Sequence, residues 1–175
     1  MNDVIKAMTD RRSCRSFASE MPSTEDLDAI VEAGLYAANG KGMQAPIVIK
    51  ITNKEVRDRL SAMNAEIMGA PEGMDPFYGA PAVLVVLASR EVPTYVYDGS
   101  LAMGNMMLAA ESLGLASIWI HRAKEEFDSE EGKALLAELG IEGDYEGIAH
   151  CVVGYRDGEK PAAAARKSGR VFSIE

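Results

Sequence analysis

Cysteine is scarce in this sequence, and long apolar runs are absent. Its 175 residues include only Cys14 and Cys151, too few for a disulfide framework or a cysteine-based metal site. No apolar run approaches the length of a membrane span, and the N-terminus lacks the basic-then-apolar order of a signal peptide. These absences predict one globular domain in a reducing cytoplasm, without a membrane partner.

Basic residues are also outnumbered, with 18 lysines and arginines against 27 acidic residues and a formal net charge of -9. Proteins that bind nucleic acid or an anionic membrane need a basic face, so the charge balance argues against both partners. The Walker loop and the GxGxxG fingerprint are missing as well. The two histidines, His121 and His150, lie outside a CxxC or HExxH context, and we expect His150 to be a hydrogen-bonded core residue.

Against this acidic background, residues 11–17 have the sequence Arg-Arg-Ser-Cys-Arg-Ser-Phe. This cluster of guanidinium and hydroxyl groups can bind one small anion, because the planar arginine fork matches the oxygens of phosphate or carboxylate. The alternative interpretation is a solvated helix end whose arginines pair with nearby acids. No histidine base lies near Cys14 in the sequence, so we expect a bystander thiol there.

Hydrophobic periodicity predicts alternating helices and strands. Ser23 and Asn53 are placed to cap two of the helices, and the glycine-rich turn 39–42 is expected to end the first of them. The apolar run 82–87 predicts a strand buried on both faces, and the segment 69–81 predicts a loop of the length that often forms lids. The predicted helices cover residues 4–8, 24–35, 54–67, 96–113 and 129–139, and the predicted strands cover 47–51, 82–87, 117–120 and 148–155.

The arginine cluster resembles the N-terminal RRSxRxF signature of the nitroreductase family, which binds flavin mononucleotide (FMN). Four further segments resemble the family's motifs in the same order, so that the resemblance covers nearly the whole chain. They are the small-residue loop 37–46, the central-helix residues 98–115, the segment 117–122, and Val153-Gly154-Tyr155 together with the tail pair Arg166-Lys167.

The resemblance implies an α+β nitroreductase-like fold, with a central, mainly antiparallel sheet flanked by helices. Residues 1–155 would form a single FMN-binding domain. Residues 156–175 would form a C-terminal extension that wraps the other subunit of a homodimer and adds a strand to its sheet. Two flavin sites would lie at the subunit interface, which would explain why the tail is polar and the central helix is apolar on most sides.

The resemblance also implies a role for each site residue. The first cluster and the tail would hold the flavin phosphate, and the backbone after the 117–120 strand would donate to the ring nitrogen that accepts hydride. The implied contacts are Arg11, Ser13, Arg166 and Lys167 to the phosphate; Arg12 and Arg15 to the phosphate, ribityl chain or pyrimidine edge; Asn64 to the pyrimidine ring; His121 and Arg122 to the ring nitrogen; and Ala38, Asn39, Gly40 and Gln44 to the flavin of the other subunit.

The implied activity is transfer of electrons from NADH or NADPH through FMN to an aromatic acceptor, a nitroaromatic or a quinone, in a ping-pong sequence. No catalytic side chain and no metal are expected. The main competing interpretation is an FMN-binding carrier or sensor with little turnover. We also consider reductive dehalogenation, flavin fragmentation, and an interaction protein without a cofactor.

Overall fold

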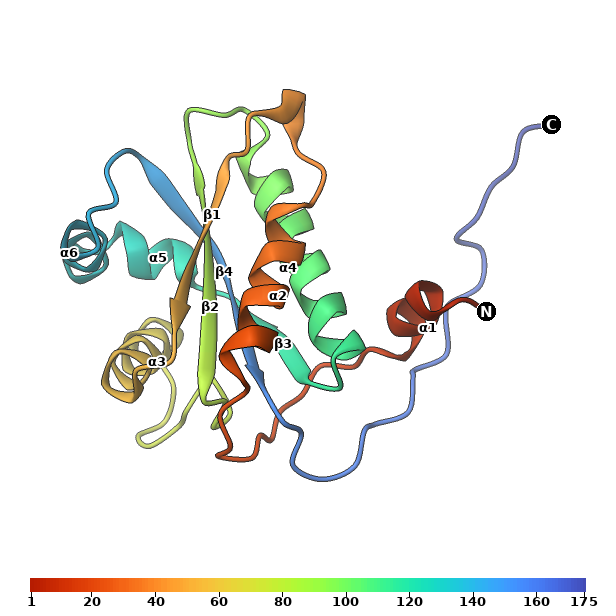
Figure 1. The fold of residues 1–175 in the computed structure, drawn as a ribbon, viewed down its shortest axis with the longest axis horizontal. Helices are drawn as coiled ribbons and strands as arrows, with labels where there is room; N and C mark the ends of the chain where they lie inside the picture. Colours follow the sequence, from red (N-terminus) through yellow and green to blue (C-terminus); the bar gives the residue numbers. More distant parts are fainter.

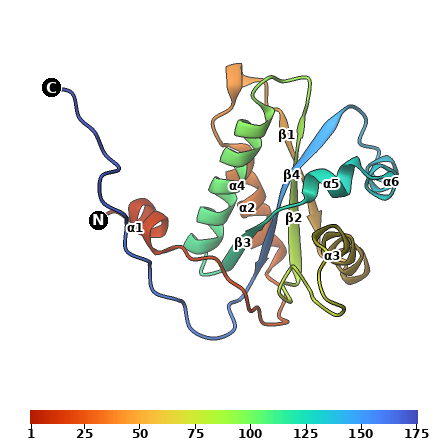
Figure 2. The same ribbon diagram turned by 180° about the vertical axis from the view of Figure 1, so that it is seen from behind.

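The computed structural model describes residues 1–175 and contains one antiparallel sheet between two layers of helices (Figure 1; Figure 2 shows the reverse side). The strands are β1 (Pro46–Ile51), β2 (Ala82–Ser89), β3 (Ala116–Ile120) and β4 (Tyr145–Gly154), and the helices are α1 (Asp3–Asp10), α2 (Thr24–Leu35), α3 (Lys54–Met68), α4 (Tyr95–Ser112), α5 (Ala123–Asp128) and α6 (Glu130–Glu138). The strand order is β1-β2-β4-β3, and all neighbours are antiparallel. Helices α2 and α4 cover one face, whereas α3, α5 and α6 cover the other. The predicted α+β class and antiparallel sheet are confirmed.

Strand β2 lies inside the sheet and is buried on both faces. Val83 and Val85 belong to the core beneath α3, α5 and α6, whereas Leu84 and Val86 belong to the core beneath α2 and α4. A strand with two buried faces carries a continuous apolar run instead of an alternating one. The sequence prediction for this strand is therefore confirmed, and the ladder extends it to Ser89.

Two predicted helix caps are also confirmed. Oδ1 of Asn53 accepts a hydrogen bond from the backbone N–H of Val56 at 3.0 Å, and Oγ of Ser23 accepts one from Asp26 at 3.0 Å. Each cap satisfies a first-turn donor that has no partner inside its helix. The starts of α2 and α3 are therefore encoded by local sequence.

Helix α2 covers the predicted residues 24–35, but its C-cap is Tyr36, and Gly40–Gly42 forms a separate 3-10 turn beyond the helix end. The larger differences from the prediction lie at β4 and before α6. Strand β4 begins at Tyr145, earlier than predicted. The single helix predicted from Ser129 is preceded by α5, and extended Ser129 separates the two helices and caps α6. With only six residues, α5 is too short to show a helical period in the sequence.

The loop at residues 69–81 is fastened to α3. Asp75 accepts hydrogen bonds from the guanidinium of Arg57, from the hydroxyl of Ser61 at 2.5 Å, and from the backbone N–H groups of Phe77 and Gly79 at 2.9 and 2.7 Å. Arg57 is 8 % exposed and lies 5.4 Å from the centroid of the Phe77 ring. The loop was correctly predicted, but these contacts hold it down and give no support to its interpretation as a lid.

Replacing Asp75 with asparagine is expected to lower the melting temperature most at neutral pH. Burial acts to raise the pKa of Asp75, but the hydrogen bonds it accepts outweigh burial and hold the pKa below its ordinary value of 3.8. A carboxyl whose pKa is lowered by folding stabilises the native state above its unfolded pKa, and this stabilisation is lost as the pH falls through the folded pKa. The difference in melting temperature between wild type and Asp75→Asn should therefore narrow below about pH 4. A difference that is constant across thermal melts at decreasing pH would contradict this account.

None of the helices has the length and apolar character of a membrane span.

Apolar side chains are exposed on the outer side of α4 and on α1. Tyr97 and Leu101 on α4 are 72 % and 51 % exposed, and Val4 and Met8 on α1 are 62 % and 55 % exposed. Because the inner side of α4 is also buried, this helix is apolar on most sides, as the sequence predicted. Exposed apolar side chains that form a contiguous patch often mark an interaction site.

Residues 157–175 leave the body as an exposed tail without secondary structure. The N–H of Asp157 donates to the carbonyl of Ser16 at 2.9 Å, and Lys160 pairs with Glu111 of α4. Beyond these contacts the tail runs past α1 and away from the sheet (Figure 1). Its apolar side chains are unburied, with 86 %, 90 % and 103 % exposure at Val171, Phe172 and Ile174.

Candidate flavin site

Strand β3 forms one edge of the sheet, and its outer side meets the segment that follows α1. Ser13 and Ser117 form a single parallel bridge there, and the N–H of Cys14 donates to the carbonyl of Ser117 at 3.1 Å. The segment then leaves β3 and pairs Phe17 with Arg156. The remaining outer edge of β3 has no strand beside it. Residues at both ends of this open edge were predicted to bind FMN.

The arginine end of the edge contains three buried polar atoms that have no hydrogen-bond partner. They are Nη1 of Arg11, Nε of Arg12 and Oγ of Ser117. The guanidinium of Arg12 is held in place at Nη1, which donates to the carbonyls of Thr9 and Arg11 at 2.7 Å. Buried polar groups without partners cost free energy. The cluster therefore fits an anion with several acceptor oxygens, as a phosphate has.

The arginines of this cluster are not neutralised within the chain. None of the ion pairs involves Arg11, Arg12 or Arg15. Helix α1 ends at Asp10, and its C-cap is Arg11, whose N–H donates to the carbonyl of Ala7. Ser13 is half-buried and Arg15 is exposed. The interpretation of a helix end with paired arginines is therefore wrong for this structure.

Both thiols are shielded from solvent. Cys14 is 0 % exposed, with its Sγ 3.0 Å from the carbonyl of Ser16. Burial raises the pKa of Cys151 to about 12, although the charge of Arg11 acts to lower it. A reactive cysteine needs a thiolate and access to its substrate. The buried position of Cys14 agrees with the bystander role expected from the sequence.

At its other end, β3 runs into a tight turn at His121 and Arg122. Arg122 has a left-handed conformation with φ of 77° and forms the N-cap of α5. Its Nε donates to Oδ1 of Asn64 at 2.9 Å, while Nδ2 of Asn64 donates to the carbonyl of His121 at 2.9 Å. The indole N–H of Trp119 donates to Nδ1 of His121 at 3.2 Å. Side chains from α3 and β3 therefore fix this turn.

Asn64 was predicted to lie against the pyrimidine ring, but the structure places it beneath the turn. It is 0 % exposed, and its Nδ2 also donates to Glu126. Both polar atoms of the amide are thus engaged inside the chain. Asn64 therefore supports the turn from below, and its place against the pyrimidine ring stays a prediction.

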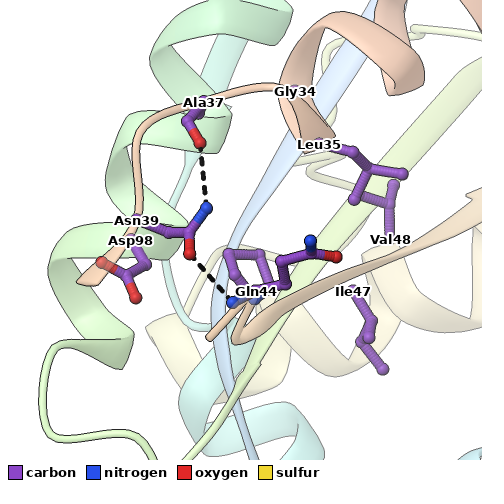
Figure 3. Close-up of a pocket in the computed structure, with 9 residues that line it drawn as sticks. Gly34, Leu35, Ala37, Asn39, Gln44, Ile47, Val48 and Asp98 are labelled. Carbon is purple, nitrogen blue, oxygen red and sulfur yellow. Dashed lines mark hydrogen bonds between the residues drawn. The ribbon is translucent and has the colours of Figure 1, made fainter. Parts of the chain in front are cut away.

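A second group of predicted residues lies at the opposite edge of the sheet, where a pocket separates the end of α2 from the start of β1 (Figure 3). Asn39 closes the loop that lines it: its Oδ1 accepts from the N–H of Gln44 at 2.9 Å, and its Nδ2 donates to the carbonyl of Ala37 at 3.3 Å. The side chain of Gln44 extends toward β1 at Ile47 and Val48. Ala38 is exposed on the same loop.

Helix α4 anchors this loop from the other side. The carboxylate of Asp98, 3 % exposed, accepts from the N–H of Gly40 at 3.0 Å and from the hydroxyl of Thr94 at 2.9 Å. A Cβ at Gly40 would lie 2.1 Å from Oγ1 of Thr94, so only glycine fits this approach. The loop near β1 and the arginine cluster near β3 belong to opposite edges of one sheet, and a single chain does not bring them together.

The tail residues Arg166 and Lys167 are exposed as well. The guanidinium of Arg166 donates to the carbonyl of Ala164 in the tail itself, at 3.1 and 2.6 Å. Arg166 and Lys167 were predicted to bind the same phosphate as Arg11, but within one chain they do not lie beside Arg11. Ser117, in contrast, was not among the predicted site residues, because only the fold places it opposite Ser13.

A family model described as the nitroreductase family matches residues 8–155. This chain belongs to that family. A curated relative from Bacillus subtilis (strain 168), named FMN reductase (NAD(P)H), is 31 % identical over 140 residues, which are 67 % of this chain and 53 % of the relative. A putative NADH dehydrogenase/NAD(P)H nitroreductase from Archaeoglobus fulgidus is 28 % identical over 91 % of this chain and 89 % of its own length. This nitroreductase-family chain thus spans about half of the Bacillus relative and most of the Archaeoglobus one.

Solved nitroreductases share the whole architecture. A nitroreductase with bound FMN from Bacteroides fragilis NCTC 9343 is 28 % identical and superposes with a TM-score of 0.89 over 100 % of both chains. A nitroreductase with bound FMN from Desulfitobacterium hafniense DCB-2 is 29 % identical, with the same TM-score and coverage. The nitroreductase-like fold that the motifs implied is confirmed.

Proposed function

We propose that this protein is an FMN-dependent oxidoreductase that takes its electrons from NAD(P)H. The observation that carries the proposal is the set of unpaired buried polar atoms on Arg11, Arg12 and Ser117, which match the needs of a phosphate. Relatives named FMN reductase and NAD(P)H nitroreductase, and neighbours with bound FMN, support the same cofactor. When bound, FMN supplies hydride and electron transfer that amino-acid side chains do not offer.

The open edge of β3 suits an elongated nucleotide. Ser117 and His121 are four residues apart on this edge, which corresponds to about 13 Å of extended chain. We assign the phosphate to Arg11, Ser13 and Ser117, and the ring to the backbone at His121 and Arg122. Arg12 and Arg15 would supply positive charge near the ribityl chain or the pyrimidine edge, where a cation favours the anionic reduced flavin.

The complete site requires a homodimer in this proposal. The exposed apolar side of α4 and the tail would meet a second copy, with residues 1–155 as the body and residues 156–175 as an exchanged extension. The loop before β1 and the open edge of β3 lie at opposite edges of the sheet, which supports this arrangement. In a dimer, the loop residues Ala38, Asn39, Gly40 and Gln44 would then face the flavin of the other subunit. Arg166 and Lys167 would cross to the phosphate held by the other chain.

The acceptor in this proposal is a small aromatic molecule, a nitroaromatic or a quinone, reduced in a ping-pong sequence after the nicotinamide has left. Aromatic area against a planar ring selects such acceptors with little help from hydrogen bonds. No catalytic side chain is assigned, so solvent or the acceptor would supply protons. A cytoplasmic location stays a prediction from the sequence.

The visible absorption spectrum of the purified protein tests this function most directly. We expect flavin bands that bleach when NADH or NADPH is added without oxygen and return when a quinone is added. Bands that persist with both donors would favour an FMN carrier or sensor instead. A colourless protein that takes up no added FMN would overturn the proposal.

A further inference from the structure

The turn at His121 and Arg122 is supported by three buried side chains from three elements. Asn64 of α3, Glu126 of α5 and His150 of β4 are each 0 % exposed. Nε2 of His150 lies 2.8 Å from Oε2 of Glu126, and Oε1 of Glu126 accepts a hydrogen bond from the Asn64 amide. This network connects the turn to β4, which lies inside the sheet.

Asn64 is the member of the network that contacts the turn. Its Nδ2 donates to the carbonyl of His121 and its Oδ1 accepts from Nε of Arg122, both at 2.9 Å. One amide therefore holds the backbone of one turn residue and the side chain of the next. Nδ1 of His150 is the one buried side-chain polar atom of this network without a partner. The bonds at Asn64 and Glu126 are all made, and buried polar groups that are paired in this way hold one another in place.

The conformation of Arg122 needs such support. Its φ of 77° lies in the left-handed region, which is unfavourable for every residue with a Cβ and routine for glycine. Strained backbone persists only where surrounding contacts enforce it, and it is concentrated at functional sites. Here the enforcing contact on the side chain is the bond to Asn64.

We propose that Asn64, held by Glu126, is a positioning residue that keeps Arg122 left-handed and thereby aims the backbone N–H groups of the turn at the flavin ring. In this role Asn64 acts through Arg122. This inference rests on the proposed function, and it adds a role for side chains that lie beneath the cofactor surface.

The first experiment compares Arg122→Gly with Arg122→Ala by titration of FMN into the flavin-free protein. Both variants remove the same guanidinium, but only glycine adopts the left-handed conformation without strain. We expect Arg122→Ala to bind FMN about tenfold more weakly than Arg122→Gly, a ratio typical of the penalty for a Cβ in this conformation. Equal dissociation constants would overturn the proposal, because the conformation of residue 122 would then not matter.

The second experiment replaces Asn64 with leucine, which is similar in size and makes no hydrogen bonds. We expect FMN to bind about tenfold more weakly and the midpoint potential of the bound flavin to move, by about 30 mV for each tenfold difference between binding of the oxidised and the reduced form. Adding Arg122→Gly to Asn64→Leu should restore both values, because glycine does not need the amide.

Ser61→Ala is the matched control for a loss of α3 stability. Ser61 is 5 % exposed on the same helix, and its hydroxyl bonds to Asp75, away from the turn. We expect this variant to lower the melting temperature but to leave FMN affinity and potential at wild-type values. A melting-temperature loss in Asn64→Leu without a change in affinity or potential would contradict the positioning role. Failure of the wild-type protein to bind FMN would instead remove the proposed function itself.

Discussion

Replacing Arg11 with alanine is expected to raise the dissociation constant of FMN by about 10- to 100-fold, because a hydrogen bond to a charged group contributes about 1.5–3 kcal/mol. Arg11 carries a buried Nη1 without a partner at the edge of β3, so a phosphate there would gain a bond that water does not supply. Arg166→Ala should weaken binding as well, and the double variant should be the weakest of the three. Quenching of FMN fluorescence during titration measures all three constants.

Two arginines serve as controls for the loss of a charge. Arg170 lies on the same exposed tail as Arg166, and Arg59 forms a surface ion pair with Glu131 at 3.2 Å. Alanine at either position should leave FMN affinity within about twofold of wild type, since surface pairs contribute little. If Arg11→Ala behaves like these controls, the phosphate assignment is wrong.

A mixed dimer of Arg11→Ala and Arg166→Ala subunits tests whether the tail crosses to the other chain. With exchanged tails, one site would carry both substitutions and the other site neither, so half of the sites should bind FMN with wild-type affinity. With tails that stay on their own chain, every site would carry one substitution. Isolation of the mixed dimer through two different affinity tags, followed by FMN titration, separates the two arrangements.

Removal of residues 161–175 is expected to convert the protein from a dimer to a monomer and to weaken FMN binding by roughly 100-fold or more, because two cationic contacts are lost together. The tail is exposed along this length and its apolar side chains pack on nothing within the chain. The sheet and helices should therefore keep their melting transition. Light scattering after size-exclusion chromatography gives the mass, and circular dichroism follows the melt.

A substitution pair refines the truncation experiment. Phe172→Ser removes an apolar side chain from the tail, where it is 90 % exposed, whereas Leu139→Ser removes one after α6, where it is 51 % exposed. Only Phe172→Ser should weaken the dimer, since Leu139 is the C-cap of α6, and α6 covers the face of the sheet opposite α4. A truncated protein that stays dimeric and retains FMN would show that the tail has no part in assembly.

Much of the fold could be predicted because the signals were local. The doubly buried strand β2, the caps at Ser23 and Asn53, and the arginine cluster after α1 all lie in short contiguous stretches. Helix α5 could not be predicted, because six residues do not complete two turns and one of its buried positions is Glu126 rather than an apolar residue.

The buried residues that support the turn at His121 and Arg122 could not be predicted from the sequence for a different reason. Asn64 and Glu126 are 62 residues apart and Glu126 and His150 are 24 apart, so only the packing of α3, α5 and β4 reveals that they touch. Arg122 gave no sign of a left-handed turn, because the residue that normally signals this conformation is glycine. The motif resemblance placed the turn correctly in the chain but could not show what holds it.

The exposed tail also makes the protein vulnerable to partial proteolysis. Unstructured segments are preferred sites of cleavage, and a cut after Lys160 would leave the folded body intact. If tails are exchanged, such a clipped chain could still receive the tail of a full-length chain while donating none in return. Each clipped chain would then leave the intact subunit beside it with an incomplete site, so that the damage would fall on a chain that was never cut.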